Sequence, residues 1–90
     1  MYRIETTPQF DDDLRRLDRT IAARIIERAE WLAEHPDTIR VPLKHMPRDL
    51  RGLHRDRVGD YRILLWVNHQ EQVLTLYGVA HRRAVYRRLR

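Results

Sequence analysis

The alternation of hydrophobic and polar positions changes its period along the chain, and each change predicts a different element. Residues 1–6, MYRIET, alternate with a period of two, which predicts a short strand. Thr7 then fits the N-cap of a helix, and Pro8 fits its first turn. The predicted buried stripe of this helix consists of Phe10, Leu14 and Leu17. The sequence therefore opens with a predicted strand followed by a predicted helix.

A second helical pattern begins near residues 18–20 and ends before Pro36. Its predicted buried face consists of Ile21, Ile25, Ala29 and Leu32, widened by Ile26, Trp31 and Ala33. Little sequence separates the two helices, so they form either a helical hairpin or one kinked helix. Residues 36–50 hold three of the four prolines and show no clear periodicity, which predicts a loop.

Three further strands are predicted from residue 53 onward, in the segments LHRDRV, YRILLWV and VLTLYGV. Gly59 and Asp60 separate the first two segments and form a glycine-first two-residue turn, which specifies a tight hairpin. The predicted order is an N-terminal strand, a helical pair, a three-stranded antiparallel meander that completes a sheet, and a short C-terminal helix. This order is an α+β fold. Ninety residues suit one small core, so we expect a single domain over residues 1–90.

The hairpin turn determines which side chains share a face of the predicted sheet. It places Arg57 opposite Arg62 with both side chains on one face, and the register carried through the next turn places Tyr77 beside Arg62. The opposite, core-facing side collects Ile63, Leu65, Val67, Leu74 and Leu76. The face with the two arginines also presents Arg55, Leu64, Trp66, Val73 and Thr75.

Opposed arginines need compensating negative charge, because like charges across a ladder destabilise a sheet by up to about 1 kcal/mol. One explanation is that carboxylates of the chain itself, from Asp56, Asp60 or Glu5, or simply water, solvate the arginines. The other is that a phosphate group supplies the charge, with Tyr77 or Trp66 as a stacking surface for a base. The spacing of the residues leaves both explanations open.

Composition shows how the charge is distributed. Residues 1–37 carry six basic and nine acidic side chains, whereas residues 38–90 carry twelve basic and four acidic ones. All but one of the basic residues are arginine, whose guanidinium suits bidentate phosphate contacts. The chain has no cysteine and no apolar run long enough to cross a bilayer, so we expect a cytoplasmic protein that does not bind a membrane.

The segment VAHRRAVYRRLR adds basic residues at the end of the last predicted strand. His81, Arg82 and Arg83 emerge there, close to the point where the preceding strand begins with Arg62. Because antiparallel neighbours start and end at the same edge, these residues are expected on one rim of the sheet.

A short helix is predicted after this rim. Val85 and Leu89 are expected to dock on the domain while Tyr86 points elsewhere, and Arg83 and Arg87 share an edge of the helix. A plain amphipathic cap on the domain would show the same pattern, so this segment does not define a function by itself.

Two motifs together resemble a known family. GLHRDRVGDYRILLWV and the later VAHRRAVY are similar to segments of the RelE/ParE superfamily of bacterial type II toxin–antitoxin toxins, and TPQFDDDLRRL is similar to its opening helix. The resemblance implies a toxin of this fold that is neutralised by a cognate antitoxin protein. RelE-like members are metal-independent messenger RNA endoribonucleases that act on the ribosome, whereas ParE-like members inhibit DNA gyrase and have no nuclease activity.

The resemblance and the strand register together select nine candidate site residues. The candidate catalytic residues are Arg62, His81, Tyr86 and Arg55. The candidate phosphate-binding or RNA-binding residues are Arg57, Arg82, Arg83, Tyr77 and Arg87. The strand before the hairpin turn carries arginines where the best-known RelE-like enzymes carry lysines.

These residue types suit cleavage of RNA without a metal. Arg62 is expected to clamp the phosphate as charge develops on it, with help from the neighbouring strand. Imidazole titrates near neutral pH, so His81 is the candidate general base or acid, while Tyr86 is expected to stack on a base or donate a proton. No histidine spacing typical of a metal site occurs, and we expect neither metal nor cofactor.

The leading expectation is therefore a toxin that cleaves messenger RNA in association with the ribosome, with both as its partners, and the alternative is an inhibitor that binds DNA gyrase without catalysis. In either case Leu64, Trp66 and Val73, and the exposed side of the helices, are expected to dock an antitoxin segment, since apolar residues on a solvent face suggest a missing partner.

Overall fold

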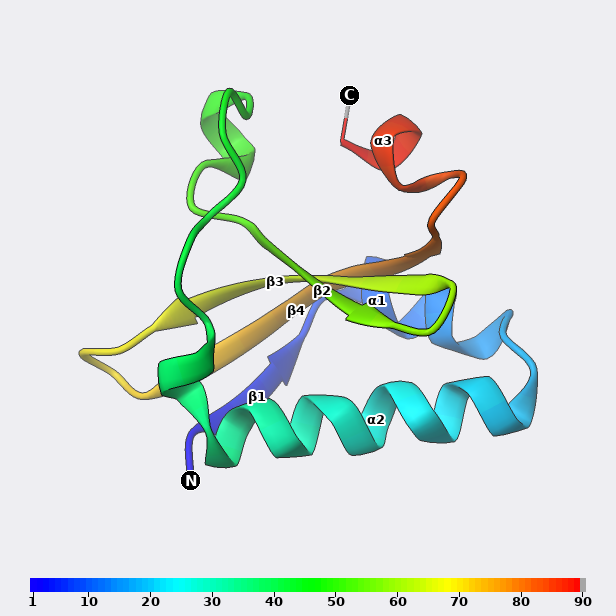
Figure 1. The fold of residues 1–90 in the computed structure, drawn as a ribbon, viewed down its shortest axis with the longest axis horizontal. Coiled ribbons are helices and arrows are strands. Elements are labelled where there is room, and N and C mark those ends of the chain that lie inside the picture. Colours follow the sequence, from blue (N-terminus) through cyan, green and yellow to red (C-terminus); the bar gives the residue numbers. More distant parts are fainter. Residues whose placement is uncertain (90) are drawn as a thin grey trace.

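The computed structural model describes residues 1–89 and contains one four-stranded sheet with helices packed against it (Figure 1). The strands are β1 (Arg3–Thr6), β2 (His54–Val58), β3 (Tyr61–Asn68) and β4 (Val73–His81). The helices are α1 (Pro8–Arg15), α2 (Arg19–Glu34) and α3 (Val85–Arg88), with 3-10 turns at Pro36–Thr38 and Arg48–Leu50. The strand order is β1-β4-β3-β2, with β1 parallel to β4 and the other pairs antiparallel. The predicted α+β fold is confirmed.

The start of α1 is fixed by a side-chain cap. Thr7 has an extended backbone, and its Oγ1 accepts a hydrogen bond from the Phe10 amide at 3.1 Å, while Pro8 occupies the first turn. The same hydroxyl donates to the Tyr77 carbonyl of β4 at 2.7 Å, which ties the helix start to the sheet. Residues 16–18 separate α1 from α2, so the helices form a hairpin and not one kinked helix.

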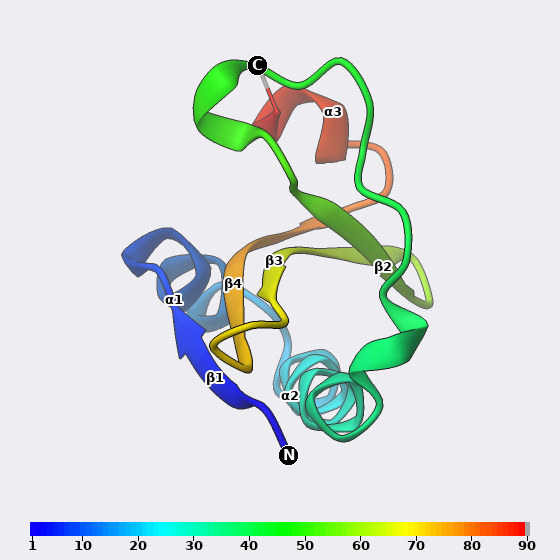
Figure 2. The ribbon, with the colours of Figure 1, turned by 90° about the vertical axis from the view of Figure 1, so that its left-hand side faces the viewer.

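The two helices cover one face of the sheet and enclose the main core (Figure 2). The buried members of this first cluster are Phe10, Ile25, Ala29, Leu32, Ala33, Ile63, Leu65, Leu74, Leu76 and Val79. Ile26 and Trp31 were predicted to widen the buried face of α2, but each is 39% exposed. Neither belongs to the first cluster, so this part of the prediction is wrong.

A second, smaller cluster lies on the opposite face of the sheet, beneath α3 and the long loop, which rise on the same side of the sheet in Figure 1. Its buried members are Leu50, Leu53, Leu64, Ala80, Val85 and Leu89. Leu64 is fully buried here and Val73 is 7% exposed, while Trp66 packs at the edge of the cluster and donates from Nε1 to the Arg51 carbonyl at 3.0 Å. The predicted apolar docking row is therefore wrong, because Leu64 and Val73 are buried and the loop and α3 cover Leu64.

A change of register between Leu64 and Leu65 shifts the pairing of β3 with β4. Leu65 lies opposite Leu76, but Leu64 lies opposite Gly78, so Tyr77 is the extra residue of a β-bulge. The bulge places Ala80 opposite Arg62, and Tyr77 instead packs against Trp66, with ring centroids 5.2 Å apart. The prediction that Tyr77 lies beside Arg62 is wrong, because the predicted register did not include this bulge, for which Gly78 inside the strand was the available signal.

One carboxylate is buried where α1 lies along β4. Asp13 is 6% exposed, and its Oδ2 accepts a hydrogen bond from the Val79 amide at 3.1 Å. β1 pairs only with residues 73–76 of β4, so the edge of β4 beyond them lacks a strand partner. Asp13 satisfies an amide on that edge and thereby joins α1 to the sheet. Within residues 1–89, no helix has the combination of length and apolar composition required to span a membrane.

Candidate active site

The β2–β3 hairpin brings two arginines directly opposite each other. Gly59 begins the two-residue turn with a positive φ of 56°, a conformation that glycine adopts without strain. Val58 then pairs with Tyr61, and Arg57 pairs with Arg62, as the turn predicted. Both arginines lie on the face of the sheet that carries α3, so the hairpin concentrates like charge at one position.

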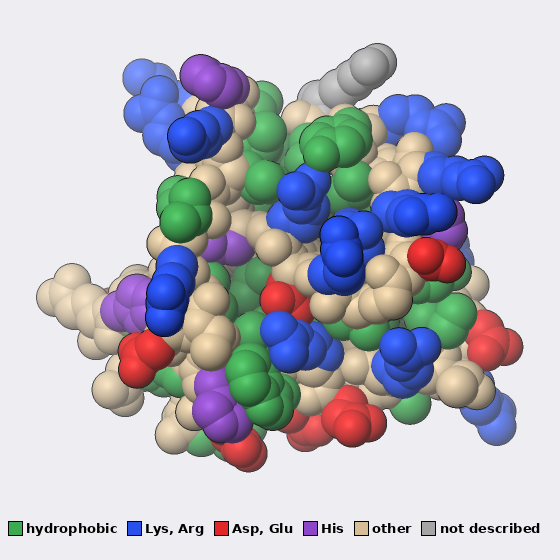
Figure 3. All heavy atoms as spheres, in the orientation of Figure 1, with side chains coloured by type: hydrophobic (Ala, Val, Ile, Leu, Met, Phe, Trp, Pro, Cys, Tyr) green, Lys and Arg blue, Asp and Glu red, His purple; other side chains and the backbone are tan. Residues whose placement is uncertain are grey.

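A hollow of about 430 Å³ lies between this hairpin and α3, and we call it the arginine pocket. Its lining residues are Arg55, Arg57, Arg62, Arg82, Val85 and Tyr86. No carboxylate of residues 1–89 lines it, and Figure 3 shows basic side chains gathered over the hairpin and the C-terminal part of the chain. Among residues 1–89 the only ion pair of a lining arginine joins Arg82 Nε to Asp60 Oδ1 at 3.7 Å, and both side chains are exposed. The pocket therefore presents largely uncompensated positive charge.

Neutral acceptors hold two of the guanidinium groups in place. Arg55 Nη1 donates to the Tyr86 hydroxyl at 2.6 Å, and its Cζ lies 5.7 Å from the centre of the Tyr86 ring. Arg62 Nη1 donates to the carbonyls of Gly59 and Tyr61 at 3.0 and 2.9 Å. These contacts orient the guanidinium groups without neutralising them, so an anion entering the pocket meets preorganised donors.

The second hydrophobic cluster positions the C-terminal side of the pocket. Val85 and Leu89 are buried in that cluster, as predicted, and they fix α3 against the sheet. Tyr86 is 63% exposed, and its side chain lines the pocket. The Arg82 amide donates to the Asp60 carbonyl at 2.7 Å, which fastens the segment before α3 to the hairpin turn. The packing of Val85 and Leu89 therefore sets the position of Tyr86, and the backbone hydrogen bond to Asp60 sets the position of Arg82.

The structure does not bring His81 into the arginine pocket. His81 pairs with Tyr61 across β3 and β4, and the two rings meet edge to face with centroids 5.4 Å apart. Tyr61 packs against the first cluster, and side chains alternate along β4, so His81 lies on the helix-covered face of the sheet. Its Nδ1 accepts a hydrogen bond from the Arg83 amide at 3.2 Å.

The other candidates lie around the pocket and not in its lining. Arg83 and Arg87 are exposed on the turn before α3 and on α3 itself. Tyr77 is half-buried in the second cluster, beside Trp66. The structure thus groups Arg55, Arg57, Arg62, Arg82 and Tyr86, whereas His81, Tyr77, Arg83 and Arg87 lie outside the group. Val85 completes the lining, a role that its predicted docking position did not reveal.

The lining residues limit the chemistry available in the pocket. Guanidinium groups remain protonated at neutral pH, so they bind and stabilise an anion but do not transfer protons. Tyr86 is the one side chain of the described lining whose hydroxyl can give or take a proton. The pocket therefore combines an anion clamp with a single phenol.

The environment of His54 shifts the pKa of its imidazole. It lies on β2, half-buried and opposite Leu65, on the face away from the arginine pocket. Burial lowers the pKa of its imidazole, and the nearby charge of His69 lowers it further, while a hydrogen bond with the Val41 backbone opposes the change. Among the described residues no three histidine or carboxylate side chains come together as a metal site.

Comparisons with known proteins identify the family of this chain. The family model described as the ParE toxin of the type II toxin–antitoxin system parDE matches residues 4–86. A Mycobacterium tuberculosis protein named Toxin RelE is 33% identical over 87 residues, which cover 96% of this chain and 87% of the relative. Toxin RelG of the same organism is 31% identical over 88 residues, which cover 97% of this chain and 98% of the relative.

Solved structures of related toxins have a similar fold. The crystal structure of the toxin–antitoxin complex RelBE2 from Mycobacterium tuberculosis contains a chain that matches with a TM-score of 0.75 and 28% identity, over 89% of this chain and 96% of that chain. The isolated Escherichia coli RelE toxin matches with a TM-score of 0.70 and 19% identity, over 99% of this chain and all of that chain, a likeness of fold alone. The chain therefore belongs to the RelE/ParE superfamily of toxins of type II toxin–antitoxin systems.

Proposed function

We propose that this toxin is a metal-independent messenger RNA endoribonuclease that acts on the ribosome in the bacterial cytoplasm and is neutralised by a cognate antitoxin. The observation that carries this proposal is the arginine pocket, a hollow that four guanidinium groups and one phenol line and that no carboxylate of residues 1–89 lines. A pentacoordinate phosphorane concentrates negative charge on its oxygens, and preorganised guanidinium groups stabilise such charge.

The reaction follows from the groups in the pocket. The ribose 2′-oxygen attacks the adjacent phosphorus and loses its proton, and the bond from phosphorus to the 5′-oxygen breaks as that oxygen gains a proton. Arg62 and Arg57, facing each other across the hairpin, clamp the phosphate, and Arg55 orients the Tyr86 hydroxyl. The products are a 2′,3′-cyclic phosphate and a 5′-hydroxyl end.

We assign proton transfer to Tyr86 in preference to His81. The Tyr86 hydroxyl lies in the pocket, whereas the His81 ring lies against Tyr61 on the other face of the sheet. Arg83 and Arg87 are exposed next to the pocket, so they are suited to contact phosphates that flank the cleaved bond. Arg82 borders the pocket and is suited to the same task.

The alternative function is inhibition of DNA gyrase without catalysis. The matching family model carries the ParE description, whereas the curated relatives in Mycobacterium tuberculosis carry RelE and RelG names. We favour RNA cleavage because the pocket contains a phenol in contact with a guanidinium, which a protein that only binds gyrase does not require. The antitoxin partner is proposed because the Mycobacterium tuberculosis structural relative was solved as a toxin–antitoxin complex.

The test is to incubate the purified toxin with programmed ribosomes and to map new RNA 5′ ends. We expect cuts with 5′-hydroxyl ends, and we expect Arg62→Ala to lower the cleavage rate by about 10²- to 10³-fold because it removes one charge-stabilising donor. Arg15→Ala is the matched control, since Arg15 is an exposed arginine of α1 paired with Asp12. Intact transcripts, together with gyrase supercoiling that stalls when the toxin is added, would reject the nuclease and establish the alternative.

A further inference from the structure

A second hollow, of about 460 Å³, lies between α2 and the back of the β2–β3 hairpin, and we call it the α2 groove. Its lining comes from α2, between Arg24 and Glu34, and from Val58 of β2. Asp56 and Val58 point from β2 toward α2, whereas Arg55 and Arg57 point into the arginine pocket. The α2 groove and the arginine pocket therefore lie on opposite faces of the same strand.

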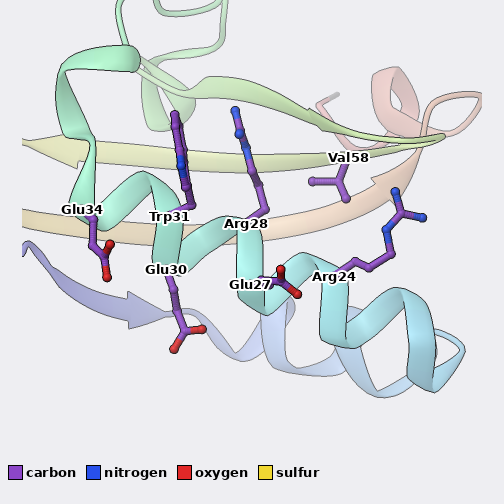
Figure 4. A pocket seen from close by; sticks show the side chains of 7 residues that line it. All are labelled: Arg24, Glu27, Arg28, Glu30, Trp31, Glu34 and Val58. Atoms are coloured by element: carbon purple, nitrogen blue, oxygen red, sulfur yellow. The ribbon is translucent and has the colours of Figure 1, made fainter.

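Trp31 forms an immobilised aromatic wall of the α2 groove. Its ring stacks on His35, with centroids 4.2 Å apart and an interplanar angle of 19°, and Arg28 Cζ lies 4.5 Å from the ring centre. Arg28 is itself fixed by two hydrogen bonds to Asp56, at 2.7 and 3.1 Å, and the hydrogen bond raises the pKa of its guanidinium. Figure 4 shows Trp31 and Arg28 rising side by side from α2 toward β2. An exposed aromatic side chain held in one orientation loses little conformational entropy when a partner covers it.

Carboxylates form the outer rim of the α2 groove. Glu27, Glu30 and Glu34 are exposed on α2, and none of them makes an ion pair within residues 1–89. Like charges four residues apart, as at Glu30 and Glu34, destabilise a helix. In the groove lining, Arg28 is paired with Asp56, so Arg24 is the one guanidinium left to offset three carboxylates. The rim is therefore negative in a protein whose formal net charge is +5.

This charge selects the kind of partner. Nucleic acid is disfavoured, because its phosphates would face the three carboxylates, whereas lysine or arginine side chains would find unpaired acceptors there. Acidic side chains line the lower border of the molecule over α2 in Figure 3, and basic ones lie above them. A segment with an apolar side chain between basic residues complements both the aromatic wall and the rim.

We propose that the α2 groove docks a segment of the cognate antitoxin in which an apolar side chain packs on Trp31 and Val58 while flanking lysines or arginines pair with Glu27, Glu30 and Glu34. The inference rests on the antitoxin partner proposed above and not on the nuclease activity. Because β2 separates the groove from the arginine pocket, this segment contributes affinity without occupying the pocket. The complex therefore needs a second antitoxin contact to block the arginine pocket.

The test uses the full toxin and the full-length antitoxin encoded by the adjoining reading frame. Calorimetric titration is performed with the unchanged toxin, with a Glu30→Lys/Glu34→Lys variant and with Trp31→Ala. We expect each variant to lose about tenfold or more in affinity, with the charge variant losing less at high salt because its effect is electrostatic. Circular dichroism establishes that each variant is folded, and RNA cleavage by the free variants is expected to be unchanged.

The matched control is Glu5→Lys/Glu71→Lys, which makes the same change of charge on β1 and on the β3–β4 turn, outside the α2 groove. We expect this control to bind the antitoxin as the unchanged toxin does. Unchanged affinity of both groove variants, or equal losses in the groove and control variants, would overturn the proposal. Concentration-dependent self-association that the groove variants abolish, with antitoxin affinity unchanged, would assign the groove to a second copy of the chain and would also overturn it. Absence of RNA cleavage by the unchanged toxin would count against the proposed function but not against antitoxin binding in the α2 groove.

Discussion

Replacing Arg57 by glutamine should change the salt dependence of RNA binding by an amount that the arginine pocket specifies. Four arginines line the pocket. Each phosphate neutralised on a single strand contributes about −0.7 to the slope of log affinity against log salt concentration. The four pocket arginines together contribute about −2.8 to the slope, so this contribution to affinity should fall about 50-fold between about 50 and about 200 mM salt.

With Arg57→Gln the pocket's contribution to the slope should rise to about −2.1, and the same increase in salt should weaken that contribution only about 18-fold. Arg62→Gln should give the same slope, and the double variant about −1.4. Arg57→Gln should not be less stable than the unchanged protein, because it removes a cross-strand repulsion worth up to about 1 kcal/mol. The assay is fluorescence anisotropy with a short labelled RNA that carries a 2′-deoxy nucleotide at the cleavage position.

The control for this assay is Arg15→Gln, which removes the same charge from α1, on the opposite face of the sheet. Its slope should equal that of the unchanged protein. Slopes that stay near the unchanged value in both Arg57→Gln and Arg62→Gln would refute the argument that these guanidinium groups contact phosphate. Equal reductions in the pocket variants and the control would do the same, since they would indicate a diffuse effect of net charge.

Two further predictions concern stability. Leu64→Ala should lower the free energy of unfolding by about 2–5 kcal/mol in urea denaturation, because Leu64 is fully buried beneath α3; a loss near zero would show that this face of the sheet is solvated. The pKa of His54 is lower in the folded protein than its ordinary value of 6.5, so the unfolded chain binds the proton more tightly and stability should fall as pH drops below about 6.5. His54→Gln should reduce that pH dependence, measured by denaturation between about pH 8 and about pH 5.5, and an unchanged dependence would contradict the assignment.

The sequence alone determined the elements whose formation depends on neighbouring residues. The Thr7 cap and Pro8 predicted the start of α1, since both act through backbone groups within one turn. The Gly59-Asp60 turn predicted the pairing of Arg57 with Arg62, because a two-residue loop leaves one register for the strands that it joins. The centre of the candidate site was therefore present in the local pattern.

Contacts between distant segments decided the rest. The extra residue Tyr77 shifts the pairing of β4 with β3 by one residue. The packing that stabilises this bulge comes from Trp66, which lies on another strand. The face of the sheet on which His81 lies depends on the same pairing of β3 with β4. Leu64 is buried because the long loop and α3 cover it, and alternation along a strand does not show whether its second face is covered.

The burial of Asp13 and the form of the α2 groove also depend on contacts between distant segments. Asp13 is buried because α1 lies beside the part of β4 that β1 leaves unpaired, and its carboxylate accepts the Val79 amide there. Trp31 is exposed because Arg28, held by Asp56 of β2, keeps its ring on the flank of α2. Helical spacing and turn chemistry act over a few residues, so the sequence determined the elements and the arginine pair. Burial and face depend on segments far apart in the chain, so only the tertiary structure decided which side chains line each hollow.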